Sequence, residues 1–353
     1  MAGERLLVYG ANGFVGSAAA RLARDLGLEP VAAGRDAEAV ARVARELEVE
    51  ARPFALDDPR AVARALEDAR VVLNMAGPFV GTYRQLVGAC LEAGSHYVDI
   101  TGELPVLEGM AGSDGPARER GVMLLPSAGL DSVPADCLAA HLARRLPRAT
   151  RLRFALRTVG PAGLPPGTQR TMIALSHLPD RVVAGGRLVT AAGTPSMAVD
   201  FGLGDGPVTV VRYPGPDPFV AHRTTGVPDV QAFVALPPAL RLAYRALRLA
   251  RPLLRPEPVR RLLSHVVLPG PSEEARARSS THTWAEARDD AGGVAAARLH
   301  GPEGAVEWTV RLALAVARRA LAGDAPPGLQ TPAGAYGADL VLECEGVTRE
   351  DVT

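Results

Sequence analysis

The 353-residue chain contains no lysine, so all 39 of its basic side chains are arginines. Without a lysine amine the protein cannot hold pyridoxal phosphate through a Schiff base or build a Walker A phosphate loop. The Tyr-x-x-x-Lys pair of short-chain dehydrogenases is excluded for the same reason. Arginine does not replace a titrating lysine, because it keeps its proton in proteins.

Cysteines and aromatic residues are scarce, and the charges are balanced. The three cysteines lie far apart without a CxxC pair and no HExxH spacing occurs, so we expect no disulfide framework and no metal. With 4% aromatic residues and 39 acidic residues against 39 basic ones, nothing favours a nucleic-acid partner. No run reaches 18 apolar residues, and residue 6 already begins a strand pattern. We therefore expect neither a membrane span nor a signal peptide, and a cytoplasmic protein.

Short apolar runs alternate with helical patterns over the first 148 residues. Residues 37–47 form one such helical pattern, with proline at the start of the next, and the runs between helices hold mostly Val, Leu and Ala. Strands are predicted at 6–9, 31–33, 51–55, 71–75, 97–100 and 122–126. Apolar runs between helices are typical of strands buried on both faces. The sequence therefore predicts an α/β protein with a doubly wound parallel sheet of the Rossmann type.

The pattern changes after residue 148. Shorter alternating runs with many glycines and prolines, at 150–157, 187–192 and 207–212, indicate a second sheet that is mixed or antiparallel. Near the end of the chain, the sequence predicts a strand at 279–287, a helix at 305–321 and a strand at 339–344.

The segment Gly-Ala-Asn-Gly-Phe-Val-Gly at 10–16 follows the first predicted strand and opens the first helix. Glycines at this place allow a tight turn and let the backbone approach a pyrophosphate, whose charge the helix N-terminus stabilises. The strand before, the helix after and the second strand further on support a dinucleotide site. The predicted contacts from this turn are Gly10, Asn12, Gly13, Phe14, Val15 and Gly16.

Arg35 follows the second strand, where NAD enzymes place a carboxylate on the ribose 2′-hydroxyl. A guanidinium suits a 2′-phosphate, so we predict NADP over NAD. The carboxylate of Asp36 leaves NAD as an alternative, unless Asp36 serves instead as the N-cap of the next helix. Asp57 and Asp58 are placed to meet the adenine amino group or, equally, to cap the helix that begins at Pro59. The turn after the fourth strand should face the ribose and nicotinamide through Asn74, Ala76, Gly77 and Pro78.

Six sequence blocks together resemble one family. They are GANGFVG at 10–16, AGRD at 33–36, LNMAGPF at 73–79, CLEAGSHYVDITGE at 90–103, AGLDSVPADCLAAHLARR at 128–145 and GLQTPAGAYGADLVLE at 328–343. The chain resembles the saccharopine dehydrogenase-like oxidoreductases, particularly the branch with trans-acting enoyl reductases of bacterial lipid-forming polyketide synthases. The resemblance implies a Rossmann domain (1–148), an inserted mixed α/β substrate domain (149–304) and a C-terminal segment (305–353) that returns to the first domain.

The same resemblance implies NADP-dependent reduction of an activated C=C bond in an apolar acyl substrate, such as an enoyl thioester. Reduction of a C–N or imine bond, as in saccharopine dehydrogenases, is the alternative within enzymes. The alternative that is not an enzyme is a dinucleotide-binding sensor or a lipid-surface protein without turnover, because fold alone does not fix function.

Reduction of an enoyl thioester needs a donor for the enolate oxygen and a source of a proton. In a lysine-free chain, groups at the carboxyl edge of the parallel sheet are the candidates. They are Tyr83, Thr101 and Asp131, with Glu103 and Ser127 at the same edge. Tyr83 has an alternative as a helix-surface residue, and Asp131 as the N-cap of the next helix.

Arg241, Arg245 and Arg248 fall on one face of a predicted helix within 240–254, and leucines fall on another. A basic amphipathic helix can bind an anionic membrane or an acidic acyl-carrier protein, and an ordinary solvated face explains the pattern equally well. Peripheral membrane association and a homodimer both stay open at this stage.

Overall fold

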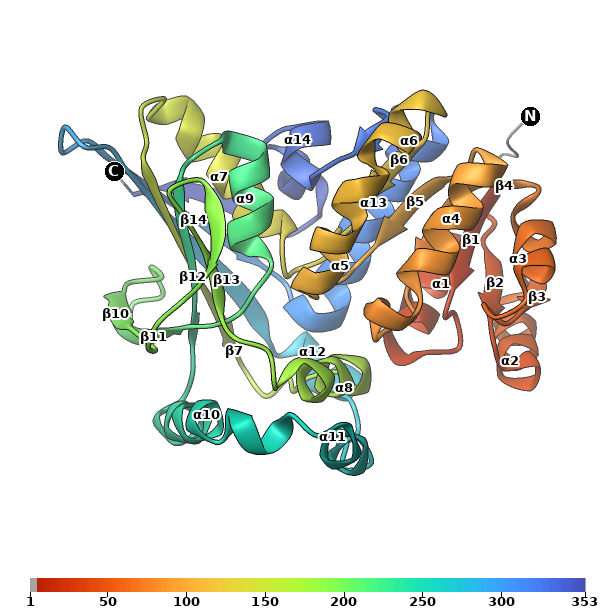
Figure 1. Ribbon diagram of the computed structural model, residues 1–353, viewed down its shortest axis with the longest axis horizontal. Coiled ribbons are helices and arrows are strands. Elements are labelled where there is room, and N and C mark those ends of the chain that lie inside the picture. Colours follow the sequence, from red (N-terminus) through yellow and green to blue (C-terminus); the bar gives the residue numbers. More distant parts are fainter. Residues whose placement is uncertain (1–4, 353) are drawn as a thin grey trace.

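Two β-sheets side by side form the framework of the computed structural model, which describes residues 5–352 (Figure 1). The first sheet has the strand order β15-β6-β5-β4-β1-β2-β3, and all neighbouring strands are parallel. The predicted doubly wound Rossmann sheet is thereby confirmed. Its strands are β1 (Arg5–Tyr9), β2 (Val31–Gly34), β3 (Ala51–Pro53), β4 (Ala69–Asn74), β5 (His96–Asp99), β6 (Met123–Leu125) and β15 (Gly328–Leu329).

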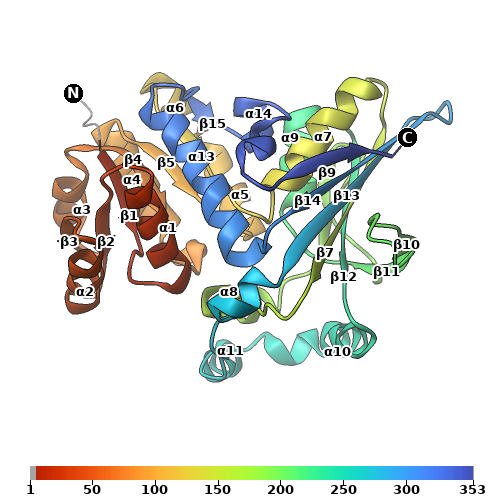
Figure 2. The same cartoon turned by 180° about the vertical axis from the view of Figure 1, so that it is seen from behind.

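Both faces of the first sheet are buried, because successive side chains of a strand point to opposite sides. Leu6 and Val8 of β1 lie in one hydrophobic cluster, and Leu7 and Tyr9 lie in the other. Helices α1, α2 and α13 cover the first face, with α13 beside α1 in Figure 2, and α3 to α6 cover the second. These helices are α1 (Phe14–Asp25), α2 (Ala37–Leu47), α3 (Pro59–Leu66), α4 (Tyr83–Ala93), α5 (Leu104–Met110), α6 (Asp114–Glu119) and α13 (Thr309–Leu321).

The second sheet is mixed, as predicted. Its order is β10-β11-β12-β7-β13-β14-β16, the hairpin β8–β9 joins it through β12, and only the pair β12–β7 is parallel among the described strands. Helices α7 (Val133–Arg145) and α9 (Asp217–Thr225) pack on it. The strands are β7 (Arg151–Val159), β8 (Arg181–Ala184), β9 (Arg187–Thr190), β10 (Ser196–Val199), β11 (Val208–Arg212), β12 (Asp229–Ala235), β13 (Ser280–Arg288), β14 (Val294–Gly301) and β16 (Thr348–Asp351).

The last segment of the chain serves both sheets. Strand β15 extends the first sheet beside β6, and β16 forms the edge of the second sheet beside β14. The predicted strand at 339–344 is wrong, because Leu340–Glu343 forms a 3-10 helix. Leu340 and Val341 are neighbours in sequence and both are buried, which one turn of helix allows and the alternating sides of a half-buried strand do not.

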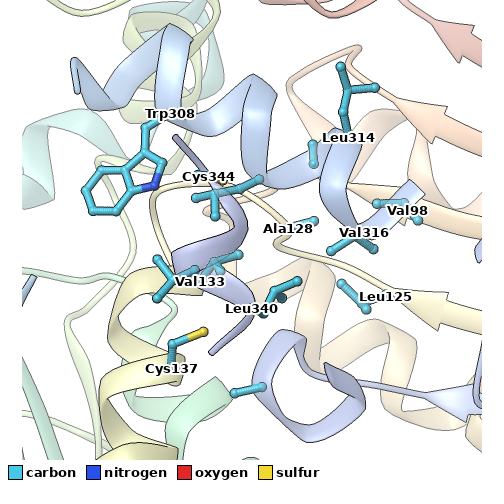
Figure 3. Close-up of a cluster of buried hydrophobic side chains, with 14 of the residues drawn as sticks. Val98, Leu125, Ala128, Val133, Cys137, Trp308, Leu314, Val316, Leu340 and Cys344 are labelled. Atoms are coloured by element: carbon cyan, nitrogen blue, oxygen red, sulfur yellow. The ribbon is translucent and has the colours of Figure 1, made fainter. Parts of the chain in front are cut away.

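One continuous hydrophobic cluster joins the two sheets around α7. Figure 3 shows Val133 and Cys137 of α7 near Leu340 and Cys344, with Trp308 on the same side. The cluster continues through α13 to the strands of the first sheet. Because α7 contributes to both cores, it fixes the second sheet against the carboxyl edge of the first.

A row of short helices lies at one end of the second sheet. It contains α10 (Pro238–Leu249), a 3-10 turn (Arg251–Leu254) and α11 (Glu257–Leu263), and Figure 1 shows α8 (Pro166–Leu175) and α12 (Glu273–Ala277) at the same end. None of the helices in the described part of the chain is both long and apolar enough to cross a bilayer.

The predicted arginine face of α10 does not form one solvated stripe. Arg248 forms an ion pair with Asp180, whose side chain is fully buried, and Arg245 is exposed. Arg248 therefore contributes to packing inside the protein, and the expectation that all three predicted arginines face outward is wrong for it. Charge attraction to a buried carboxylate is the physical reason for this orientation.

Asp136 makes folding stability depend on pH. This α7 carboxylate accepts a hydrogen bond from the backbone N–H of Ala333 (2.7 Å), and burial raises its pKa to about 7. In the unfolded chain the proton leaves near pH 4. Because the folded state keeps the proton longer, this stability contribution is full below about pH 4 and is lost as pH rises through about 7.

We therefore expect the melting temperature to fall between pH 5 and pH 8, and to fall less in Asp136→Asn. Each unit of pKa difference corresponds to about 1.4 kcal/mol. Thermal unfolding followed by circular dichroism measures the effect, with Asp25→Asn at an exposed position as the control. Equal slopes in wild type and Asp136→Asn would contradict this assignment.

Candidate functional site

Only glycine fits at two positions where β1 leads into α1, one in the turn and one in the first turn of the helix. Gly10 has a φ of +87°, and a Cβ there would lie 2.9 Å from the backbone nitrogen of Ala76. A Cβ on Gly16 would lie 2.0 Å from the carbonyl oxygen of Gly10. A Cβ on Gly13 would lie 3.1 Å from the same carbonyl oxygen, a tight contact but far less severe than the one at Gly16. The fold therefore excludes a side chain most strictly at Gly16, and less strictly at Gly13.

No side chain caps α1, in contrast to the next two helices of the sheet. Asp36 accepts from the N–H of Ala39 (3.0 Å), and Asp58 accepts from the first turn of α3. The first N–H groups of α1 thus remain available for an anion, as a pyrophosphate requires. Asp36 is the predicted helix cap, which removes the main argument for NAD.

Three residues meet where β1, β2 and β3 end. Burial raises the pKa of Tyr9, while the charge of Arg35 lowers it and that of Asp57 raises it, so both charged groups lie close to the ring. Arg35 and Asp57 are exposed, and Asp58 rather than Asp57 caps α3. The cap alternative for Asp57 is therefore wrong. Arg35 and Asp57 both remain available to the adenosine end of a dinucleotide.

Asn74 shapes the turn after β4 from inside. Its amide nitrogen donates to Thr82 Oγ1 (3.1 Å) and to the hydroxyl of Tyr97 (3.0 Å), and its oxygen accepts from the backbone N–H of Ala76 (3.0 Å). The side chain is fully buried. Asn74 thus fixes the shape of the turn, and residues 76–78 form the outer surface of that turn.

The carboxyl edge of β5 and β6 carries a buried hydrogen-bond network that the sequence did not reveal. Asp99 accepts from the Tyr97 hydroxyl (2.8 Å) and from the N–H groups of Thr101 and Ser127 (both 2.9 Å). Burial raises the pKa of Asp99 to about 6, and these hydrogen bonds act in the opposite direction. Thr101 is fully buried, and its hydroxyl accepts from the N–H of Glu103 (3.0 Å). Their place at a strand end is the only sequence signal that these residues carry.

Glu103 connects the turn after β4 to the second domain. Its carboxylate accepts from the N–H groups of Phe79 (2.7 Å) and Val80 (2.8 Å) and from the hydroxyl of Thr171 on α8 (3.0 Å). Burial raises its pKa, and the three donors oppose that shift. Glu103 is therefore a positioning residue that holds the turn and α8 together.

Tyr83 lies away from the other predicted catalytic residues. It is 3% exposed and belongs to the hydrophobic cluster beneath α3 and α4. Its hydroxyl is buried beside Gly109 of α5 and has no hydrogen-bond partner within residues 5–352. The helix-surface alternative for Tyr83 is therefore wrong, and the structure places it in the core.

Asp131 lies at the junction of the two domains. Ser132 occupies the N-cap position of α7 without a side-chain hydrogen bond, so the cap alternative for Asp131 is wrong. The side chain packs against Gly102, where a Cβ would lie 2.4 Å from Asp131 Oδ2. Burial raises the pKa of Asp131 to about 6.

Two further acidic groups, Tyr213 and Asp217, face Asp131 from the second domain. The Tyr213 hydroxyl donates to Asp217 Oδ2 (2.5 Å). Burial raises the pKa of Asp217 to about 7, and the charge of Asp131 contributes to this shift. Sequence reasoning missed both residues, because this part of the chain carries no recognisable motif.

A cavity of about 10 Å³ lies beside this pair and is lined by Leu130, Phe154, Tyr213, Asp217 and Thr283, among others. Its size approaches that of one water molecule. The arrangement brings groups that titrate near neutral pH to the carboxyl edge of the first sheet, where ligands of such sheets bind. It can donate hydrogen bonds and supply protons without a lysine.

The glycine turn, the uncapped α1 and the strand order define a dinucleotide-binding Rossmann domain. Residues 6–123 match the family described as the saccharopine dehydrogenase NADP binding domain. The prediction of NADP and the resemblance to this family are confirmed.

Curated relatives match less than half of the chain. Trans-acting enoyl reductase of Mycobacterium ulcerans is 33% identical over 152 residues, covering 40% of this chain and 35% of that protein. Saccharopine dehydrogenase-like oxidoreductase of Homo sapiens is 30% identical over 151 residues, covering 37% and 35%. The matched region thus spans about a third of the length of these relatives.

A solved structure extends the likeness in fold to the second domain. Apo saccharopine dehydrogenase (L-Glu forming) from Saccharomyces cerevisiae aligns with a TM-score of 0.65 and 12% identity, covering 99% of this chain and 100% of that one. The combination of a Rossmann sheet with a second mixed sheet is therefore shared with that enzyme.

Substitutions at Gly13 and Gly16 should separate binding from folding. Gly13→Val should leave the sheet folded and weaken NADPH by at least about a hundredfold, because its methyl groups would occupy the pyrophosphate position. Gly16→Ala should instead lower the melting temperature, because its Cβ collides with the carbonyl of Gly10 in the turn after β1. Calorimetric titration and thermal unfolding measure the two effects. Tight NADPH binding by folded Gly13→Val would remove the site from this turn.

Arg35→Ala should weaken NADPH far more than NADH. It removes a charge-assisted bond to a phosphate that only NADPH carries, worth roughly 1.5–3 kcal/mol or about ten- to a hundredfold. Arg64→Ala is the matched control, because this exposed arginine lies in the last turn of α3, at the end of the helix that is farther from Asp57. Dissociation constants that rise equally for both cofactors would mean that Arg35 does not contact the 2′-phosphate.

Proposed function

We propose that the protein is an NADPH-dependent reductase that acts on an activated C=C bond in an apolar acyl substrate, such as an enoyl thioester. The observation that carries this proposal is the 152-residue similarity to trans-acting enoyl reductase, in a chain that also matches an NADP binding domain. The acidic groups at the domain junction support it, because they lie where the substrate of such a sheet binds.

Bound NADPH supplies a hydride to the β-carbon of such a substrate, and a proton must then reach the α-carbon. Residues 76–78 would face the nicotinamide of a bound NADPH, and Glu103 holds the turn that contains them in place. Tyr213 is the proposed donor to the thioester oxygen, where negative charge develops. When Asp217 carries a proton it can donate to the Tyr213 oxygen and leave the tyrosine hydroxyl free for the substrate. Asp131 is the nearest further proton source.

Reduction of a C–N or imine bond is the second candidate. The whole-chain likeness in fold to a saccharopine dehydrogenase favours it, and the same acidic groups could protonate a nitrogen. A dinucleotide-binding sensor would need only the first domain. The C=C proposal ranks first because the identity to trans-acting enoyl reductase, 33% over 152 residues, is slightly higher than the 30% over 151 residues to a saccharopine dehydrogenase-like oxidoreductase.

NADPH oxidation by the purified full chain separates these candidates. We expect turnover with apolar enoyl thioesters and none with imines or ketones of the same chain length. Turnover with imines alone would replace the C=C proposal by the C–N proposal. Tight NADPH binding without turnover on any of these substrates would favour the sensor.

Tyr213→Phe should lower kcat by about a hundredfold or more and leave the dissociation constant of NADPH unchanged. Loss of one donor to a developing oxyanion has an effect of this size. Tyr336→Phe is the matched control, because the Tyr336 hydroxyl donates to the Asp324 carbonyl (2.8 Å) away from Asp131. Steady-state kinetics at saturating NADPH measures the change, and wild-type kcat in Tyr213→Phe would exclude this role.

A further inference from the structure

Exposed aliphatic side chains are concentrated in one short part of the chain. Ten of the twenty exposed large apolar residues in the described part of the protein lie between positions 240 and 268. We call these ten residues the leucine layer. They are Leu240, Leu242, Leu247, Leu249, Leu253, Val259, Leu262, Leu263, Val266 and Leu268. Exposed apolar residues concentrated in this way indicate a candidate interaction site.

Helix α10 is turned with its polar contacts inward and its leucines outward. The Tyr244 hydroxyl donates to the carbonyl of Arg212 (3.2 Å), and Arg248 forms an ion pair with the buried Asp180. On the other side of the helix, Leu242 is 71% exposed and Leu249 is 86% exposed. The usual orientation of an amphipathic helix on a globular protein is the reverse.

Positive charge surrounds the leucine layer. Residues 238–268 contain seven arginines and a single acidic residue, Glu257. Arg261 pairs with Glu257 (2.9 Å), whereas Arg241, Arg245 and Arg255 have no ion-pair partner among the described residues. The layer therefore combines outward aliphatic side chains with unpaired guanidinium groups around them.

We propose that the leucine layer docks the protein on the surface of an anionic lipid bilayer. Aliphatic side chains would enter the boundary of the acyl region, and the surrounding arginines would contact the lipid phosphates. A second copy of the chain is a poorer partner, because a symmetric contact would bring the unpaired arginines of both copies together. An acidic protein would neutralise the arginines and leave the outermost leucines without an apolar partner.

The leucine layer is connected to the candidate site through α8. The side chain of Gln169 accepts from the N–H of Leu268 (2.9 Å) and donates to its carbonyl (3.1 Å). Two residues further along α8, Thr171 donates to Glu103 at the turn after β4 (3.0 Å). Docking would thus place the domain junction near the bilayer. Uptake of an apolar acyl substrate from the lipid rests on the proposed function, whereas docking itself does not.

Co-flotation of the full-length protein with lipid vesicles tests the proposal without any substrate. Wild type should bind vesicles of phosphatidylcholine with phosphatidylglycerol, and bind at least tenfold less to phosphatidylcholine alone. Binding should weaken as salt rises from about 0.05 to 0.5 M, because screening shortens the range of the arginine charges. No binding to the anionic vesicles at low salt would overturn the proposal.

The double variant Leu242→Ser/Leu249→Ser should bind the anionic vesicles at least tenfold less than wild type. Leu26→Ser/Val294→Ser is the matched control, because both residues are exposed apolar side chains outside the leucine layer. Undiminished binding of the Leu242→Ser/Leu249→Ser variant would overturn the proposal. A wild-type dimer that this variant converts to a monomer, without vesicle binding by either, would assign the layer to a second copy instead.

Folding and catalysis provide the remaining readouts. The Leu242→Ser/Leu249→Ser variant should keep the wild-type melting temperature, since both side chains are exposed, and the single variant Leu249→Ser should show a smaller loss of vesicle binding. Reduction of a short water-soluble enoyl thioester should be unchanged in both. Failure of the proposed reaction in wild type would leave vesicle binding as an independent result.

Discussion

The contact of Glu103 with two domains sets the geometry on which the candidate site depends. Its carboxylate receives two backbone N–H groups from the turn after β4 and one hydroxyl from α8. A buried carboxylate with three donors fixes all of them at once, because leaving any donor unpaired in the interior is unfavourable. The turn after β4, the second domain and the leucine layer are thereby held in one arrangement.

The first domain was largely predictable because its local signals agree with its tertiary structure. Residues 37–47 form a helix with the predicted bounds, since Asp36 caps it and its apolar residues repeat with helical spacing. Arg35 and the glycines at 10 and 16 could be placed because a nucleotide-binding turn restricts the backbone to few solutions. In these elements each residue type has a local reason for its conformation.

Elements fixed by distant contacts were not predictable. Strand β14 consists of Val294–Gly301, whose alanine-rich start carries little strand preference, and it forms by pairing with β13. The apolar run at 340–343 resembles a strand but has no strand beside it. Tyr213 and Asp217 become acidic-site candidates only when the second sheet brings them to Asp131. The inward turn of α10 depends on Asp180, which lies far from it in sequence.

The ion pair between Arg248 and Asp180 also determines what α10 cannot do. One can imagine a helix that buries its leucines while the protein is free in water and exposes them only on meeting a partner. Helix α10 would have to rotate about its own axis to do this. Rotation would withdraw Arg248 and leave the buried carboxylate of Asp180 with the longer contact to Arg251 (3.5 Å) as its remaining ion pair among the described residues, which is unfavourable. The ion pair with Arg248 therefore favours the orientation in which the leucine layer is displayed, whether or not a partner is present.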